Sequence, residues 1–250
     1  MSEAYSTLAR FYDLSMEVDY DEWVSYLLAL NDRHGHVPLN IIDLGCGTGN
    51  LTLPLAKRGY QLTGVDLSPE MVTVAQDKAL EVGLEVPFFV ADLRTFSLPG
   101  QVFDTAISGC DVLNYLTLES ELRQAFQAVH KLLVPGGLWL FDLNSAHKLS
   151  EIYGNQSYAD LQNDFSYFWD NSYDPEKGIV TMDLTFFVQI EGKTYERKTE
   201  QHRQKLWIPE QIQVLAPETG FVVRGCYDFL TMESYSENTE RWQFVLQRER

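Results

Sequence analysis

Three glycines at alternate positions follow a short apolar stretch that ends in an acid. The segment reads Ile41-Ile42-Asp43-Leu44-Gly45-Cys46-Gly47-Thr48-Gly49. The β-branched apolar run predicts the end of a buried strand, and the glycines predict a turn whose backbone approaches a bound molecule. Residues 50–58 then predict a helix that ends at Gly59. A strand, a glycine turn and a helix N-terminus favour a site for a nucleotide-like ligand at the carboxyl end of the strand.

Acids recur where other predicted strands end. Asp66, Asp92 and Asp111 each close or directly follow such a strand, as Asp43 does before the glycine turn. In a parallel sheet with right-handed crossovers, all these carboxyl ends lie at one edge. Carboxylates there can accept hydrogen bonds from ribose hydroxyls and attract a cationic ligand. Each acid alone is explained equally well as a turn or helix-cap residue, but their joint placement favours a binding site.

The elements that must position these acids alternate between strand and helix through residue 143. Strands are predicted at 39–44, 61–66, 86–91, 103–108 and 138–143, with helices at 21–34, 50–58, 69–81 and 118–133. This alternation favours an α/β fold with a doubly wound parallel sheet. After residue 144 the pattern changes to alternating apolar and polar residues, which predicts an antiparallel meander of about three strands. A helix at 209–219 and strands at 221–228 and 242–248 follow.

The glycine spacing does not match the dinucleotide fingerprint, which is G-x-G-x-x-G/A. Asn50 occupies the sixth position here, and Asp43 stands two residues before the first glycine. A carboxylate so close to the turn suits a ligand with positive charge and would repel a pyrophosphate. A dinucleotide oxidoreductase is therefore the weaker alternative.

Four segments resemble, in order and spacing, the motifs of class I S-adenosylmethionine-dependent methyltransferases. They are residues 43–49, 64–71, 90–93 and 132–139. The resemblance implies a Rossmann-like seven-stranded sheet with strand order 3-2-1-4-5-7-6 and an antiparallel last strand. It further implies a cofactor-binding core at 1–143 and 209–250 with an N-terminal helical cap at 1–35, and an inserted β subdomain at 144–208 that roofs the acceptor pocket. The cofactor would be S-adenosylmethionine, and S-adenosylhomocysteine the product.

The same resemblance implies roles for individual side chains. Asp66 is expected to accept hydrogen bonds from both ribose hydroxyls, and Asp92 from the adenine amine. Leu67 and Met71 would cover the adenine faces. Asp43 would orient the glycine turn or the cofactor ammonium. The other expected cofactor contacts are Leu93, whose N–H would meet an adenine ring nitrogen, and Tyr12, Gly45, Cys46, Gly47, Gly49 and Cys110.

The acceptor side is expected in the meander and after the fourth strand. Methyl transfer from a sulfonium relies on alignment and desolvation, and the histidines lack metal-ligand spacing, so no metal site is predicted. An amine acceptor must lose a proton, and His202, two residues after Glu200, is a candidate general base. The alternative for His202 is a solvated strand position. Tyr12 is the second catalytic candidate, with core packing as its alternative. Substrate contacts are expected from Tyr5, Asp111, Asn114, Tyr115 and His202.

Composition narrows the class of partner. The net charge of −17 argues against a phosphate-backbone partner and an anionic membrane surface. Three widely spaced cysteines and an N-terminus without a signal-peptide pattern predict a cytoplasmic protein. Residues 5–14 and 200–207 are similar to small-molecule methyltransferases of the sugar-amine and glycine N-methyltransferase kind. The expected partner is thus a small acceptor bearing an amine or hydroxyl, with a homodimer left open beside a monomer. A methyltransferase for tRNA or protein and a non-catalytic cofactor-binding module are the alternatives.

Overall fold

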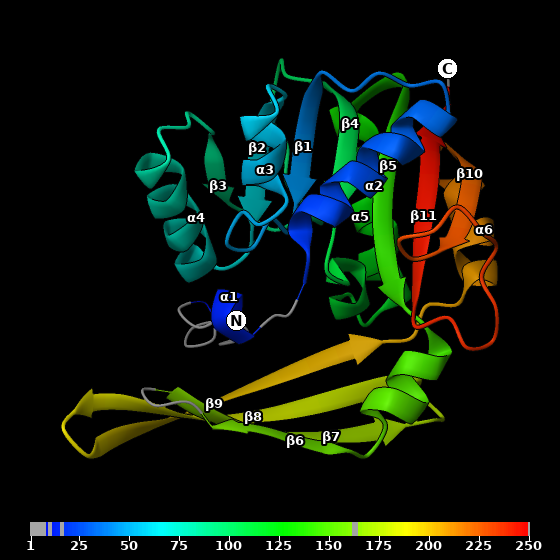
Figure 1. The fold of residues 1–250 in the computed structure, drawn as a ribbon. Helices are drawn as coiled ribbons and strands as arrows, with labels where there is room; N and C mark the ends of the chain where they lie inside the picture. The colour runs from blue at the N-terminus through cyan, green and yellow to red at the C-terminus, as the bar shows by residue number, and fades with distance from the viewer. Residues whose placement is uncertain (1–8, 10–11, 16–17, 162–164, 250) are drawn as a thin grey trace.

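The computed structural model describes residues 9, 12–15, 18–161 and 165–249. Tyr5, a predicted substrate contact, lies outside the described residues. Figure 1 shows two layers: an α/β core, and a separate antiparallel sheet that lies across one end of the core strands.

The core is a seven-stranded sheet with spatial order β10-β11-β5-β4-β1-β2-β3. Neighbouring strands from β3 to β5 pair in parallel, and β11 runs antiparallel to both β5 and β10. In chain order this is 3-2-1-4-5-7-6 with an antiparallel last strand, so the predicted topology is confirmed. The strands are β1 Asn40–Leu44, β2 Gln61–Asp66, β3 Phe88–Val90, β4 Phe103–Ser108, β5 Leu133–Asn144, β10 Phe221–Asp228 and β11 Arg241–Arg248.

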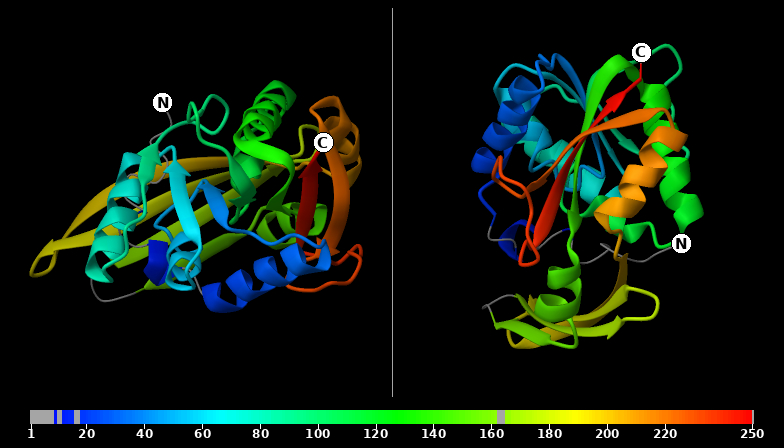
Figure 2. Two further views of the ribbon diagram at one scale, coloured as in Figure 1. Left: turned by 90° about the horizontal axis from the view of Figure 1, so that it is seen from above. Right: turned by 90° about the vertical axis from the view of Figure 1, so that its right-hand side faces the viewer.

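Helices cover both faces of this sheet, as the right-hand view of Figure 2 shows. They are α2 Tyr20–Arg33, α3 Thr52–Lys57, α4 Pro69–Glu81, α5 Glu119–Leu132 and α6 Pro209–Glu218. On one face of the sheet, an apolar cluster joins α2 and α3 to Ile41, Leu138 and Leu140. On the other face, a second cluster joins α5 and α6 to the alternate strand residues, such as Ile42 and Trp139. The predicted start of α4 is confirmed, because the Ser68 side chain accepts a hydrogen bond from the Met71 N–H and Pro69 begins the helix. Within the described ranges, no helix has the length and apolar character to cross a membrane.

Strand β5 begins earlier than predicted. The strand includes the segment Pro135-Gly136-Gly137. Phe103 of β4 pairs with Leu133 and Thr105 pairs with Leu138, so the pairing register shifts across this segment. The extra residues form a bulge opposite β4. The strand therefore reaches back to the end of α5 without a separate loop.

The second sheet, called the roof sheet below, has four strands, one more than the sequence predicted. They are β6 Ser157–Leu161, β7 Phe165–Asp174, β8 Ile179–Glu191 and β9 Thr194–Lys205. A helical turn, η3 Lys148–Tyr153, connects β5 to it. Strand β6 was missed because it is a largely exposed edge strand without an alternating apolar pattern.

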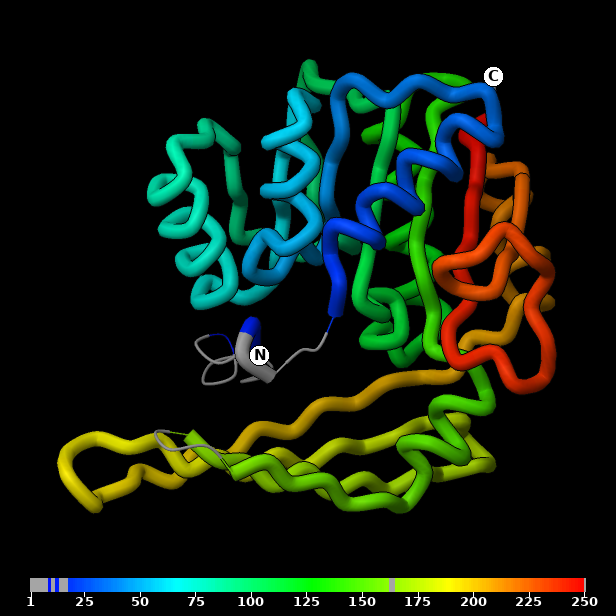
Figure 3. The backbone as a smooth tube through the Cα atoms, viewed as in Figure 1, coloured from blue at the N-terminus to red at the C-terminus, as the bar shows by residue number. Residues whose placement is uncertain are grey.

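One face of the roof sheet is turned toward the core. The register pairs Val180 with Gln204, Met182 with His202 and Leu184 with Glu200, so these side chains share a face. All six are buried. Figures 1 and 3 show β9 running along the carboxyl ends of the core strands, which places this face over the predicted binding edge.

Candidate functional site

The glycine turn after β1 is fixed by contacts to the end of β2. The Gly45 N–H donates to the Val65 carbonyl at 2.7 Å, and the Gly47 N–H donates to Asp66 Oδ2 at 2.8 Å. Both glycines have positive φ, 79° and 53°, a region that strains other residues. A Cβ on Gly45 would lie 2.4 Å from Val112 Cγ2, whereas a Cβ on Gly47 would meet nothing within 4 Å. Packing thus requires Gly45, and Gly47 leaves a strip of backbone open to a ligand.

Asp66 braces this turn from the neighbouring strand. Its Oδ1 accepts from the Ser68 N–H at 2.9 Å, while Oδ2 accepts from Gly47. Burial raises the pKa of the Asp66 carboxyl, and these backbone donors oppose that rise. Each carboxylate oxygen has a second lone pair. The predicted ribose contact therefore fits the geometry and stays a prediction.

Asp43 is buried behind the glycine turn, and among the described residues only one of its carboxylate oxygens is hydrogen-bonded. Its Oδ2 accepts from Thr52 Oγ1 at 2.6 Å, and Oδ1 has no partner among the described residues. Burial, and to a smaller degree the Asp66 charge, raise the pKa of Asp43 to about 7 against the opposing Thr52 hydrogen bond. An unpartnered buried carboxylate oxygen suits a ligand ammonium. The residues present therefore fit the zwitterionic cofactor that the motifs imply.

A narrow cleft brings together residues from four parts of the chain. They are the N-terminal part, the glycine turn, the first residues after it and the end of β4. The lining comprises Tyr12, Tyr20, Asp43, Gly45, Cys46, Gly47, Thr48, Asn50, Leu51, Gly109 and Cys110. Six of the predicted cofactor contacts therefore lie around one cleft: Tyr12, Asp43, Gly45, Cys46, Gly47 and Cys110. Gly49 is not part of this lining, and a Cβ added to it would lie 3.3 Å from Leu53 Cγ and 3.4 Å from Ala75 Cβ.

Tyr12 enters this cleft from α1, Tyr12–Ser15. Burial raises its pKa well above the usual value of a tyrosine, and the neighbouring Cys110 thiol adds to the rise. Burial likewise raises the pKa of Cys110 to about 12. Both groups therefore stay protonated at neutral pH and can present only neutral atoms to a ligand.

Asp13, next to Tyr12, attaches α1 to the glycine turn. Its Oδ1 accepts from Thr48 Oγ1 at 2.6 Å and from Asn50 Nδ2 at 2.8 Å, and its Oδ2 pairs with Lys78 Nζ at 2.6 Å. Sequence reasoning missed these partners, because Asp13 and Lys78 are separated by 65 positions. The contacts hold Tyr12 in the cleft.

The predicted adenine end is organised by an arginine that the sequence analysis did not single out. Arg94 Nη2 pairs with Asp92 Oδ2 at 2.6 Å, and its Nη1 pairs with Glu121 on α5. The Arg94 hydrogen bonds hold the pKa of Asp92 below its ordinary value. Asp92 stays ionised and oriented, while its predicted adenine contact remains untested. The two-residue spacing of acid and arginine was the available signal.

The three apolar residues predicted at the adenine are placed differently from one another. Leu67 is 60% exposed, whereas Met71 is 2% and Leu93 is 9% exposed. The Leu93 side chain belongs to the core cluster that contains Phe96. Leu67 is thus the member of this set that offers an open apolar surface.

The turn after β4 is strained. Cys110 and Asp111 have φ values of 58° and 53°, and each non-glycine residue in this region costs on the order of 1–2 kcal/mol. The Asp111 side chain does not cap η2, Val112–Tyr115, so that alternative is wrong. It accepts instead from Arg241 Nη2 at 2.9 Å and from Gln204 Nε2.

Arg241 is enclosed by this arrangement. Its guanidinium pairs with Asp111 and Asp142 and lies over the rings of Trp23 and Phe229 at 5.6 and 5.3 Å. Burial would lower the pKa of Arg241, but the two carboxylates outweigh burial and raise it. Arg241 is therefore a permanent buried cation at the edge of the site.

Asn114 links three elements. Its Nδ2 donates to the Lys205 carbonyl at 2.8 Å, and its Oδ1 accepts from the Asn144 N–H at 3.0 Å. The side chain is completely buried. The geometry gives it a joining role between η2, β5 and β9, and its predicted substrate contact stays untested.

His202 is buried between two polar groups. It is 3% exposed, with Nε2 3.2 Å from Glu200 Oε2 and Nδ1 3.1 Å from Tyr115 Oη. The alternative of a solvated strand position is therefore wrong. Two residues that are 87 positions apart, both predicted on the acceptor side, meet directly here. Glu200, itself 4% exposed, completes a chain of polar groups.

No group of three or more His, Cys, Asp and Glu side chains that could hold a metal ion occurs among the residues with described positions.

Comparisons with known proteins agree with this geometry. Residues 41–137 match the family model of a methyltransferase domain. A protein of Geobacillus sp. (strain WCH70), named as a methyltransferase, is 37% identical over 249 residues, which cover 98% of this chain and 99% of that protein.

Solved structures extend the similarity to the whole fold. An S-adenosylmethionine-dependent methyltransferase from Clostridium acetobutylicum superposes with a TM-score of 0.88 at 28% identity, covering 98% of this chain and 99% of that one. CalS10 from Micromonospora echinaspora, an amino pentose methyltransferase with S-adenosylmethionine bound, gives 0.75 at 17% identity over 99% of both chains. At that identity the second likeness concerns the fold alone.

Proposed function

The chain belongs to the class I S-adenosylmethionine-dependent methyltransferases, and on that premise we propose that it methylates an amine or hydroxyl group of a small metabolite. The cofactor supplies the electrophilic methyl group when bound. The chain's residues bind and orient the two reactants, exclude water and accept the proton that the acceptor loses. We assign the cofactor to residues 1–143 and 209–250, and the acceptor to the cover formed by residues 144–208.

The observation that carries the proposal is the buried contact of Tyr115, His202 and Glu200. An imidazole held between a phenol and a carboxylate has a fixed ring orientation and a route for a proton. In this proposal His202 acts as general base through Nδ1 or through Tyr115, and Glu200 stabilises the imidazolium that forms. Tyr12 lies in the cofactor cleft beside Cys110, where a neutral aromatic hydroxyl is suited to contact the reacting methyl group.

The charge distribution supports a small acceptor over an RNA. On β9, Arg197 lies opposite Phe187 of β8 and Arg203 lies opposite Thr181. Both arginines are on the strand face opposite to that of His202. Both are exposed, so they point away from the core edge instead of lining a basic funnel toward it. The overall charge of −17 also disfavours an RNA acceptor, because it opposes binding to a phosphate backbone.

Relatives with this architecture add support for the acceptor class. CalS10 acts on an amino pentose, and KedS8 from Streptoalloteichus, with a TM-score of 0.76, is a sugar N-methyltransferase. Their identities of 17% and 18% leave the acceptor of this chain to experiment.

Three free thiols, Cys46, Cys110 and Cys226, suit a reducing compartment, so we propose that the reaction takes place in the cytoplasm.

The test is transfer of labelled methyl from S-adenosylmethionine to a size-fractionated cell extract. We expect label in the small-molecule fraction, with stoichiometric release of S-adenosylhomocysteine, and identification of the product by mass spectrometry. Label in tRNA or protein alone would reject the proposed acceptor class. Tight cofactor binding without transfer to any fraction would instead favour a non-catalytic module. Gel filtration of the same preparation separates monomer from homodimer.

A further inference from the structure

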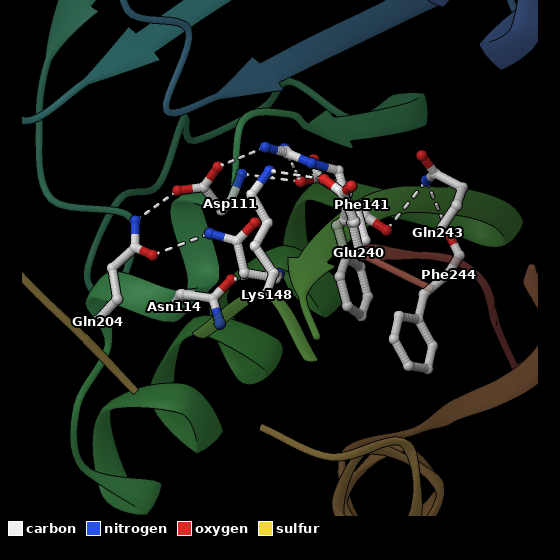
Figure 4. A network of polar contacts seen from close by, with 11 residues as sticks. Asp111, Asn114, Phe141, Lys148, Gln204, Glu240, Gln243 and Phe244 are labelled. Atoms are coloured by element: carbon white, nitrogen blue, oxygen red, sulfur yellow. Dashed lines mark hydrogen bonds and ion pairs between the residues drawn. The ribbon is translucent and has the colours of Figure 1, made fainter. Parts of the chain in front are cut away.

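A set of polar side chains joins the roof sheet to the core at the edge of the cofactor cleft. Gln204 Nε2 donates to Asp111 Oδ2, and Gln204 Oε1 accepts from Asn144 Nδ2 at 2.9 Å. Arg241 binds the other oxygen of Asp111. Figure 4 shows the Gln204 amide facing the Asp111 carboxylate at one side of the network, with Lys148 near its middle. Gln204 is 2% exposed, so this bridge is shielded from solvent.

The bridge ends one residue from the cofactor cleft. Asp111 follows Cys110, and Cys110 lines that cleft beside Tyr12 and Gly109. Gln204 itself lies on β9 and is not part of the cleft lining. A displacement of Gln204 can therefore reach the cofactor cleft through Asp111 and its turn.

The backbone at this point needs external support. Cys110 and Asp111 are consecutive left-handed residues, and such a pair persists only where its surroundings over-determine it. Asp111 receives four restraints: its N–H donates to Asp142 Oδ2 at 2.9 Å, its carbonyl accepts from the Asn114 N–H at 3.0 Å, and its carboxylate binds Arg241 and Gln204. Two of the four come from side chains that the sequence places about 90 and 130 positions away.

We propose that Gln204 and Arg241 are positioning residues that hold the strained Cys110–Asp111 turn in the conformation the cofactor requires, so that the seating of the roof sheet sets cofactor affinity. The roof is then more than a cover for the acceptor. The two ends of the site are coupled through one carboxylate, and coupling of this kind changes affinity by roughly 5- to 150-fold.

The test uses S-adenosylhomocysteine as the probe in calorimetric titration of the full chain and needs no acceptor. We expect Gln204→Met to bind it about tenfold more weakly. The matched control is Gln201→Met. Gln201 lies on the same strand, is exposed on the opposite face and donates to Asp183 Oδ1 at 2.8 Å. Equal loss in both variants, or affinity within twofold of the parent in a folded Gln204→Met, overturns the proposal.

A double-mutant cycle separates positioning from general destabilisation. If Gln204 acts through Asp111, adding Gln204→Met to Asp111→Ala will change the affinity no further, whereas independent effects would add and reject the coupling. Arg241→Lys keeps the charge without the two-pronged contact, so its affinity should lie between those of the parent and Arg241→Met. If Arg241→Met does not fold, the Gln204 cycle alone decides, because Gln204→Met preserves side-chain volume.

Because the probe is the cofactor product, a negative result here leaves the proposed acceptor class standing. A failure of methyl transfer to small molecules would equally leave this coupling intact.

Discussion

The cofactor side of the site and the side proposed for the acceptor are built in different ways. On the cofactor side, Gly47 and Ser68 donate backbone N–H groups to Asp66, only 19 and 2 residues away. On the acceptor side, Tyr115 meets His202 across 87 residues. One side depends on backbone geometry set by neighbouring segments of the chain, whereas the other depends on side chains that meet only after the roof sheet has docked.

This difference predicts different responses to substitution. Changes on the cofactor side should alter ligand affinity and backbone stability, because each acid there also supports a turn. Changes on the acceptor side should alter turnover and leave cofactor binding intact, except where the Gln204–Asp111 contact joins the two sides.

The largest expected effect is on turnover. His202→Ala should reduce the methyl-transfer rate roughly 10²- to 10⁴-fold, the range for loss of a general base, with S-adenosylmethionine affinity unchanged. Single-turnover kinetics and calorimetry measure the two quantities separately. Glu200→Gln, which keeps the hydrogen bond at Nε2 but removes the charge, should cost less. Gln201→Ala on the outer face is the control, and a rate for His202→Ala within threefold of this control would remove His202 from catalysis.

The next effect tests the close packing between the glycine turn and η2. Gly45→Ala should lower the free energy of unfolding by about 3 kcal/mol, because it adds backbone strain and a clash with Val112 on η2. Gly47→Ala has the strain without the clash and should cost about 1 kcal/mol. Urea denaturation provides both values. The assigned clash is wrong if the two variants are equally stable, or if Val112→Ala fails to relieve Gly45→Ala.

A smaller effect concerns Asp66. Asp66→Ala removes the acceptor of two backbone N–H groups and the predicted ribose contact, so cofactor affinity should fall about 30-fold. Asp66→Asn retains one acceptor oxygen and should lose less. Calorimetric titration distinguishes the variants, and unchanged affinity in a folded Asp66→Ala would rule out the ribose assignment.

The last effect is a gradual pH dependence on the cofactor side. The pKa of Asp43 is about 7 in the folded chain, above its unfolded value, so the native state binds the extra proton. Stability should therefore fall as pH rises from about 4 to 7, with a slope of at most ~1.4 kcal/mol per pH unit from this group. Denaturation of Asp43→Asn between pH 4 and 8 should show a flatter profile than the parent, and an identical profile would exclude Asp43 as the source.

Most of the fold was accessible from the sequence, because its signals are local. The Ser68-Pro69 start, the glycine turn and the alternating strands each depend on residues a few positions apart. Strand β6 was not accessible, because its exposed residues carry no periodic signal and its pairing with β7 alone defines it.

The candidate site divides in the same way. Asp43, Asp66 and Asp92 could be placed because they lie at or just after strand ends. The pairing of Arg94 with both Asp92 and Glu121 followed only from the structure. Arg241 was invisible, since its contact with Asp111 spans 130 positions. His202 was recognised as a candidate, but its burial followed only from the docking of β9 against η2.

The roof sheet leaves the core after β5 and returns to it just before α6, so both connections lie at the same end of the fold. Under the proposed division of the chain, a grafted segment in its place would bring a new acceptor specificity to an unchanged cofactor half. The Gln204–Asp111 contact limits this freedom. A donor segment must supply an amide, or an equivalent donor, at the position of Gln204, and grafts chosen for acceptor fit alone would lose cofactor affinity.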